Sequence, residues 1–239
     1  TLPNGLRCIE NDAFNDCGSL TGLTLPAGLT EIGGRAFWGC NRLNNVTIPA
    51  TVTRMGKLAF TKSNTSRMTV AVDLPARPAG WDADWAGPLV TVRWKNSGSA
   101  PAQSPAAPKP AAAVTPAKPA PKPAVASPSS DFEIKNGVLV KYRGKGGDVT
   151  VPAGVTSIGF NAFNECNNVS SITLPDGLRS IGAFAFDQCG RLTSVTIPGS
   201  VTSIGHYAFS NCDSLISITL PAGVTRIEES TFSCCGSLA

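Results

Sequence analysis

The chain has 239 residues, of which 42% are hydrophobic and 15% are charged, and its formal net charge is +4. This length corresponds to one or two domains. Lys109, Lys118 and Lys122 lie in one proline-rich stretch, which leaves about +1 for the rest of the chain. Nucleic-acid binding therefore has little support, and no run of 18 apolar residues predicts a membrane-spanning segment.

A repeat of 23 residues, LxxIxIPxxVxxIGxxAFxxCxx, runs through both ends of the chain. Its proline recurs at Pro3, Pro26 and Pro49, and again at Pro152, Pro175, Pro198 and Pro221. In the stretch 192–198, Val195 and Ile197 alternate with polar residues, which is the pattern of a half-buried strand. A unit this short cannot bury its own apolar edges, so units must stack. The sequence predicts a mainly β solenoid, with parallel strands, tight turns and one helical turn at each Ala-Phe pair.

The repeats form two short arrays. The first is predicted to occupy residues 1–95, including a C-terminal cap that holds Trp81, Trp85 and Trp94. We favour a cap that covers the solenoid end over an aromatic platform for sugars. The second is predicted at 131–239, where Asn136-Gly137 between alternating runs indicates a hairpin that caps its N-terminal end. Its last unit is expected to have no strand partner.

Residues 96–130 separate the arrays and are rich in Pro, Ala and Lys. This composition cannot form a core and predicts a disordered, semi-stiff spacer. Both chain ends fall inside a repeat and there is no initiator Met, so we expect an excerpt of a longer protein.

The sequence offers little catalytic chemistry. His206 is the single histidine, and it lies at a variable turn position. The close carboxylate pairs, Glu228-Glu229 and Asp82/Asp84, do not converge as a glycosidase requires. We therefore predict no catalytic residue, no metal site and no cofactor.

One regular polar pattern lies on the predicted strands of the second array. Its members are Ser171, Thr173, Ser194, Thr196, Ser217 and Thr219. An ordinary exposed strand surface explains such a pattern, because threonine suits strands. The functional alternative is a surface that binds a protein or glycan ligand, and an ice-binding face is also conceivable. We take these six residues as the candidate ligand site.

Six of the eight cysteines share one position of the repeat: Cys17, Cys40, Cys166, Cys189, Cys212 and Cys235. Their spacing does not match a zinc site. In-register neighbours would place their Cβ atoms slightly too far apart for a relaxed disulfide, and Ser63 replaces the cysteine in one unit. We therefore expect small buried packing groups, with Cys8 and Cys234 as candidates for reactive thiols.

The unit "LTSVTIPGSVTSIGHYAFSNC" (192–212) resembles the BspA-like leucine-rich repeat family. The opening "NGVLVKYRGKGGDVTVPAGVTSIG" (136–159) and the cap "PAGWDADWAGPLVTVRW" (78–94) are similar to that family too. The resemblance implies a non-catalytic scaffold, cell-surface or secreted, that binds a protein or glycan of the host matrix or of another cell. A passive envelope spacer, or targeting repeats of an enzyme outside this chain, are the alternatives.

Overall fold

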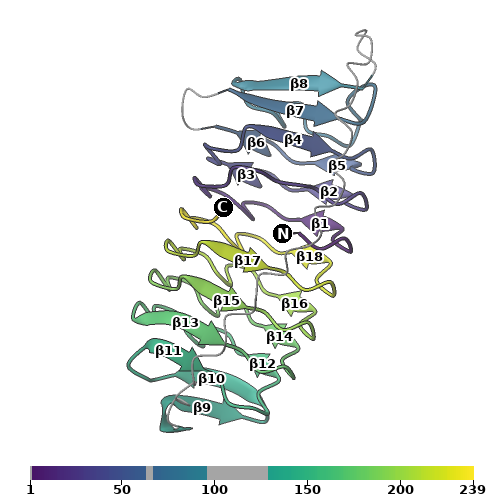
Figure 1. Cartoon of the computed structure of the whole chain (residues 1–239). Helices are drawn as coiled ribbons and strands as arrows, with labels where there is room; N and C mark the ends of the chain where they lie inside the picture. The colour runs from purple at the N-terminus through teal and green to yellow at the C-terminus, as the bar shows by residue number, and fades with distance from the viewer. Residues whose placement is uncertain (1, 63–66, 96–128) are drawn as a thin grey trace, which may run out of the picture.

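The computed structural model describes residues 2–62, 67–95 and 129–239. These residues form a solenoid of stacked rungs, with strands on two sides and turns between them (Figure 1). Within them the helical structure is limited to one 3-10 turn, Ser129–Asp131. The prediction of a mainly β solenoid is confirmed. Ser63 and residues 96–128 lie outside the described residues.

One side of the second array carries short parallel strands stacked on a hairpin. The order is β16-β14-β12-β10-β9. The strands are β9 (Phe132–Lys135), β10 (Val138–Tyr142), β12 (Ser157–Ile158), β14 (Ser180–Ile181) and β16 (Ser203–Ile204). Strands β9 and β10 pair antiparallel around Asn136 and Gly137, which both have positive φ, 51° and 76°. The predicted hairpin is therefore confirmed, and its Asn-Gly turn supplies the two left-handed residues that a tight hairpin needs.

The other side of the second array is a four-stranded parallel sheet in the order β11-β13-β15-β17. Its strands are β11 (Gly147–Thr150), β13 (Val169–Thr173), β15 (Ser194–Thr196) and β17 (Ser217–Thr219). Ile172 pairs with Val195 and Val195 with Ile218, so residues 23 apart lie side by side. The repeat period thus sets the register directly, because each turn of the solenoid returns to the same position.

The first array continues the same architecture. Strands β1 (Cys8–Ile9), β2 (Glu31–Ile32) and β5 (Arg54–Met55) stack on one side. The opposite side carries β4 (Asn45–Ile48), β7 (Met68–Val72) and β8 (Val90–Trp94), and a short pair, β3 (Phe37–Trp38) with β6 (Phe60–Thr61), lies between. Trp81 and Trp85 are 2% and 3% exposed and pack edge to face. Buried rings favour the cap over the sugar platform.

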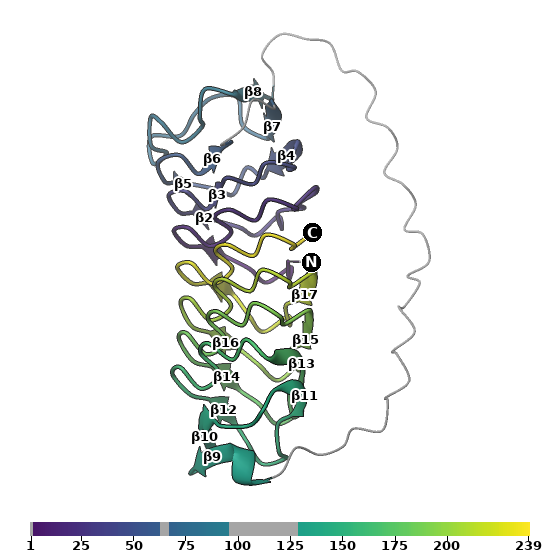
Figure 2. The same ribbon diagram turned by 90° about the vertical axis from the view of Figure 1, so that its left-hand side faces the viewer.

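The two arrays stack end to end, which the sequence analysis did not anticipate. Strand β18 (Arg226–Ile227) of the last unit pairs in parallel with β1, joining Cys8 to Arg226 and Ile9 to Ile227. The expectation that the last unit lacks a strand partner is therefore wrong. In space the second array comes first and the first array follows, as both views show (Figures 1 and 2). We call the contact between residues 225–239 and 2–20 the seam. The domain boundaries at residues 95 and 131 stay a prediction.

A column of aromatic rings forms the centre of the core and crosses the seam. Neighbouring phenylalanine centroids are 5.0 to 5.7 Å apart, in the order Phe163, Phe186, Phe209, Phe232, Phe14, Phe37 and Phe60. The residue before each Ala-Phe pair, such as Leu58 or Tyr207, has φ near 55°. The chain there makes a left-handed turn, so the expected helical turn is corrected. This turn aims each ring into the stack.

Candidate functional site: the Ser/Thr ladder

The six predicted site residues come together on one sheet. Ser171, Ser194 and Ser217 are paired in register across β13, β15 and β17, and Thr173, Thr196 and Thr219 form a second row beside them. Strands in a sheet lie about 4.8 Å apart, and alternate residues along a strand about 6.6 Å apart. We call this array of hydroxyls the Ser/Thr ladder.

The ladder faces solvent while its neighbours face the core. Thr173, Thr196 and Thr219 are exposed, whereas Ile172 and Val195 between the rows are buried. In the described part of the chain, the side chains of the three threonines and of Ser194 and Ser217 form no hydrogen bond. Each of these hydroxyls can therefore both donate to and accept from a ligand.

The two ends of the ladder differ in chemistry. At the β11 end, Asp148 accepts hydrogen bonds from the hydroxyls of Ser170 and Ser171, at 3.1 and 2.7 Å. At the β17 end lies a mostly apolar cavity of about 370 Å³ at the seam, which includes Ile218 and Leu220 in its lining. A ligand along the ladder would thus meet a carboxylate at one end and an apolar hollow at the other.

The threonine row does not continue unchanged into the first array. Thr24 lies in the segment 20–26, which is not a strand, and Thr47 lies on β4 of a separate sheet. Gly22 stands where the second array has serine, and a glycine weakens a strand because it has no side chain to pack. The regular hydroxyl surface is therefore confined to the second array.

The ladder suits hydrogen bonding rather than catalysis. Its side chains carry no charge and no imidazole, and His206 lies on the turn after β16, away from these strands. Among residues 2–62, 67–95 and 129–239, no group of three His, Cys, Asp or Glu side chains could hold a metal ion. Over those same residues, no helix has the length and hydropathy needed to cross a membrane.

The cysteine position has a defined role. Each of five buried thiols donates to the backbone carbonyl of the phenylalanine one unit earlier in the stack, at 3.1 to 3.2 Å: Cys17 to Phe232, Cys40 to Phe14, Cys189 to Phe163, Cys212 to Phe186 and Cys235 to Phe209. All eight thiols are free. Burial raises the pKa of Cys40, Cys189 and Cys235 to about 12. The packing interpretation is thus supported, with a hydrogen bond that the sequence did not show.

The expectation for Cys8 is corrected, while Cys234 stays a candidate reactive thiol. Cys8 is only 4% exposed, and burial together with the nearby Glu31 carboxylate raises its pKa to about 11. A reactive thiol needs exposure and a lowered pKa, so Cys8 fits a structural group. Cys234 is half-buried.

A second exposed feature escaped the sequence analysis. Phe160, Phe184, His206 and Tyr207 form a cluster of aromatic side chains on the turns that follow β12, β14 and β16. The rings of Phe184 and Tyr207 are parallel at 4.8 Å, and Phe160 is 64% exposed. The sequence signal that could have revealed this cluster is the recurrence of aromatic residues at two adjacent repeat positions, 23 or 24 residues apart.

Comparison with known proteins identifies the repeat. The family model of the BspA-type leucine-rich repeat region matches residues 1–74 and 142–239 with six copies. The chain belongs to this family. The family match accounts for the 23-residue unit on both sides of the seam, and the earlier resemblance is confirmed. No curated protein matches the chain.

Several solved structures are similar to this BspA-type chain. A leucine-rich repeat protein of T. pallidum is 28% identical, with 48% of this chain and 69% of that one covered and a TM-score of 0.41. A leucine-rich repeat protein of Eubacterium ventriosum is 19% identical over 94% and 66%, with a TM-score of 0.42. A leucine-rich cell surface protein of Faecalibacterium prausnitzii is 23% identical over 96% and 61%, with a TM-score of 0.37. The chain spans about two thirds of the length of these proteins.

Proposed function

We propose that the chain is a cell-surface or secreted binding module, and that the Ser/Thr ladder is where it contacts a protein or glycan ligand. The observation that carries this proposal is the set of exposed hydroxyls, in register on three strands, that lack partners in the described part of the chain. Such hydroxyls can replace water around the hydroxyls of a sugar or the backbone of a peptide. The surface location rests on the family resemblance.

The charge of the Ser/Thr ladder limits the classes of ligand that it can bind. The ladder carries no formal charge, and its one flanking carboxylate, Asp148, is engaged by Ser170 and Ser171. A neutral surface offers no long-range attraction to polyanions, so binding should depend little on salt. We therefore favour neutral glycans or uncharged peptide segments over polyanionic partners such as nucleic acid.

The test removes the hydroxyls and keeps the shape. A triple variant, Thr173→Val, Thr196→Val and Thr219→Val, retains β-branched side chains on the same strands. The matched control places the same change on the other side of the solenoid, at the exposed Thr156, Thr202 and Thr225.

Binding of the labelled chain to a glycan array and to matrix-coated surfaces is the measurement. We expect the ladder variant to lose at least tenfold in affinity, because several hydrogen bonds are removed together, and the control to bind like wild type. Equal binding by the two variants would exclude the ladder as the contact surface. An absence of any binding by wild type would favour the passive spacer or the enzyme-targeting alternative.

A further inference from the structure

The seam repeats the hydrogen-bond pattern found inside each array. Within the second array, the amide of Phe186 donates to Ala208 at 2.8 Å and that of Phe209 to Thr231 at 2.9 Å. Across the seam, the amide of Phe232 donates to Ala13 at 2.9 Å. The column of phenylalanine rings also continues across the seam, where Phe14 stacks on Phe232. The thiol hydrogen bonds continue too, because Cys17 donates to the carbonyl of Phe232. The two array ends therefore contact each other in the same way as neighbouring units inside an array.

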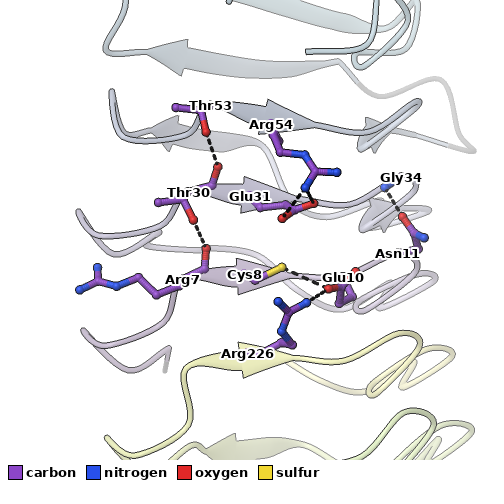
Figure 3. Close-up of polar contacts among 10 residues, drawn as sticks. All are labelled: Arg7, Cys8, Glu10, Asn11, Thr30, Glu31, Gly34, Thr53, Arg54 and Arg226. Atoms are coloured by element: carbon purple, nitrogen blue, oxygen red, sulfur yellow. Dashed lines mark hydrogen bonds and ion pairs between the residues drawn. The ribbon is translucent and has the colours of Figure 1, made fainter. Parts of the chain in front are cut away.

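Side chains add a charge pair to this interface. Figure 3 shows Arg226 of β18 directed at Glu10, beside the thiol of Cys8, and the two charged groups form an ion pair. Inside the first array, Arg54 of β5 forms an ion pair with Glu31, its register partner on β2. The Arg226–Glu10 pair connects the last unit of the second array to the first unit of the first array. Substitutions in this pair therefore change a contact between the two arrays.

The other two ends of the arrays are covered. The first array ends in the cap built on Trp81 and Trp85, and the second begins with the β9–β10 hairpin. If the arrays separated, the seam surfaces would expose stacked phenylalanine rings and backbone groups such as the carbonyls of Thr225 and Ile227. Open solenoid ends of this kind require a partner, because a repeat cannot bury its own edge.

Packing at the seam is less complete than packing inside the arrays. A cavity of about 370 Å³ lies at the seam, with Leu23, Ile218 and Leu238 in its lining. Residues equivalent to Leu23 and Ile218, such as Val46 and Val195, are buried, but these two are only half-buried. Separation is therefore easiest at the seam.

The covalent connection does not hold the seam surfaces together. It joins β8 to β9, which lie at opposite ends of the solenoid (Figure 1). The nine strands from β9 to β5 along one side imply a separation of about 40 Å at ~4.8 Å per rung. The 33 residues 96–128 can span that distance, since an extended chain covers ~3.3 Å per residue. The same length lets each array reach another molecule.

We propose that the partner of the seam surfaces is a second copy of this chain. In the exchanged dimer, the second array of each molecule stacks on the first array of the other, which forms two seams between chains in place of one within each. Exchange of identical elements is a common route to dimers. Because the contacts are the same in both forms, protein concentration decides between them. For a connection of this length in residues, closed and exchanged forms balance at about millimolar concentration.

A charge swap at the seam tests the proposal with the connection intact. In its closed form, the variant R226E places two carboxylates opposite each other at the seam, and the variant E10R places two guanidinium groups opposite each other. In a dimer exchanged between the two variants, one seam regains the native Arg226–Glu10 pair and the other seam carries the same pair of charges with the sides reversed, so both seams are attractive. After the two are unfolded together and refolded at about 0.1 mM, we expect a species of twice the 24.6 kDa chain mass, enriched roughly tenfold over either variant alone. The double variant R226E/E10R is the control and should behave like wild type.

A shortened connection gives an independent measurement. Deletion of 104–128 leaves residues 96–103 between the described arrays, which reach less than about 30 Å and cannot span the solenoid. Light scattering should then find dimers or larger species at micromolar concentration, with circular dichroism like that of wild type. The proposal is wrong if the charge-swap mixture remains monomeric at 0.1 mM, or if the shortened chain is a folded monomer.

Discussion

Thiol chemistry provides a sharp test of the packing at the repeat cysteine. We expect Cys17, Cys40, Cys189, Cys212 and Cys235 to resist alkylation in the folded protein. Each is at most 2% exposed and donates its S–H to a phenylalanine carbonyl in the adjacent rung. Only the thiolate attacks an alkylating reagent, so the rate falls with the thiolate fraction.

The expected decrease in the alkylation rate follows from the raised pKa values of the buried thiols. Burial raises the pKa of Cys40, Cys189 and Cys235 from the ordinary value of 9.0 to about 12. At pH 8 the thiolate fraction drops from about 0.1 to about 10⁻⁴, so the rate should fall roughly 1,000-fold before access is considered. Cys234 is half-buried, does not occupy the repeat position and serves as the internal reference.

The assay is iodoacetamide labelling at pH 8, followed by peptide mass spectrometry at each site. We expect Cys234 to react first, Cys166 at an intermediate rate, and Cys8 and the five buried repeat thiols last, with all eight reacting in guanidinium chloride. Two results would contradict the reasoning. The first is labelling of the buried thiols at the rate of Cys234, and the second is fewer than eight reactive thiols after unfolding, which would indicate disulfides.

Three further predictions concern stability. Because the pKa values of Cys40, Cys189 and Cys235 are raised in the folded state, their contribution to stability is complete below pH 9 and is lost as the pH rises toward 12. Over that range each thiol should lower the unfolding free energy by about 1.4 kcal/mol per pH unit, as measured by urea unfolding, and Cys189→Ser should make this pH dependence less steep. At Gly56 an added Cβ would lie 2.2 Å from the Gly34 amide nitrogen, so Gly56→Ala should lower the unfolding free energy by about 3 kcal/mol or more. Gly177 has open space around it, so Gly177→Ala should leave the unfolding free energy unchanged or raise it by up to ~1 kcal/mol. Equal thermal midpoints for the two variants would contradict the close approach at Gly56. Leu58 has φ 55°, so Leu58→Asn should raise the unfolding free energy by about 1 kcal/mol, and an unchanged denaturation midpoint would show that the turn carries no strain.

The repeat period predicted the rungs because local rules act on every unit alike. The alternation around Val195 and Ile197 and the missing N–H of Pro198 are properties of one unit, and stacking repeats them. The hairpin at Asn136-Gly137 followed from turn chemistry of the same local kind. The six ladder residues could be placed side by side for this reason, although their ligand could not be named from them.

The remaining features depend on contacts between units. The cysteine pattern identified a buried position, but the acceptor of each thiol lies 26 residues earlier in the chain or, for Cys17, on Phe232 across the seam. The aromatic cluster of Phe160, Phe184, His206 and Tyr207 forms only when three turns are stacked. The segment 20–26 matches the strand pattern but borders the cavity at the seam, so its neighbours rather than its strand propensity decide that it does not join a sheet.

The order of the rungs in space is the feature that periodicity leaves undetermined. Every unit presents the same amides, carbonyls and rings to its neighbour, so Phe232 accepts Phe14 as readily as Phe37 does. In a chain with two arrays, this equivalence permits stacking in reversed order, as the β18–β1 pair shows. It also permits the same pair to form between molecules. An exchanged dimer would carry two Ser/Thr ladders on one particle, so a weak ligand contact at each ladder would gain strength through bivalent attachment. Self-association at the seam and binding at the ladder would then act together while using separate surfaces.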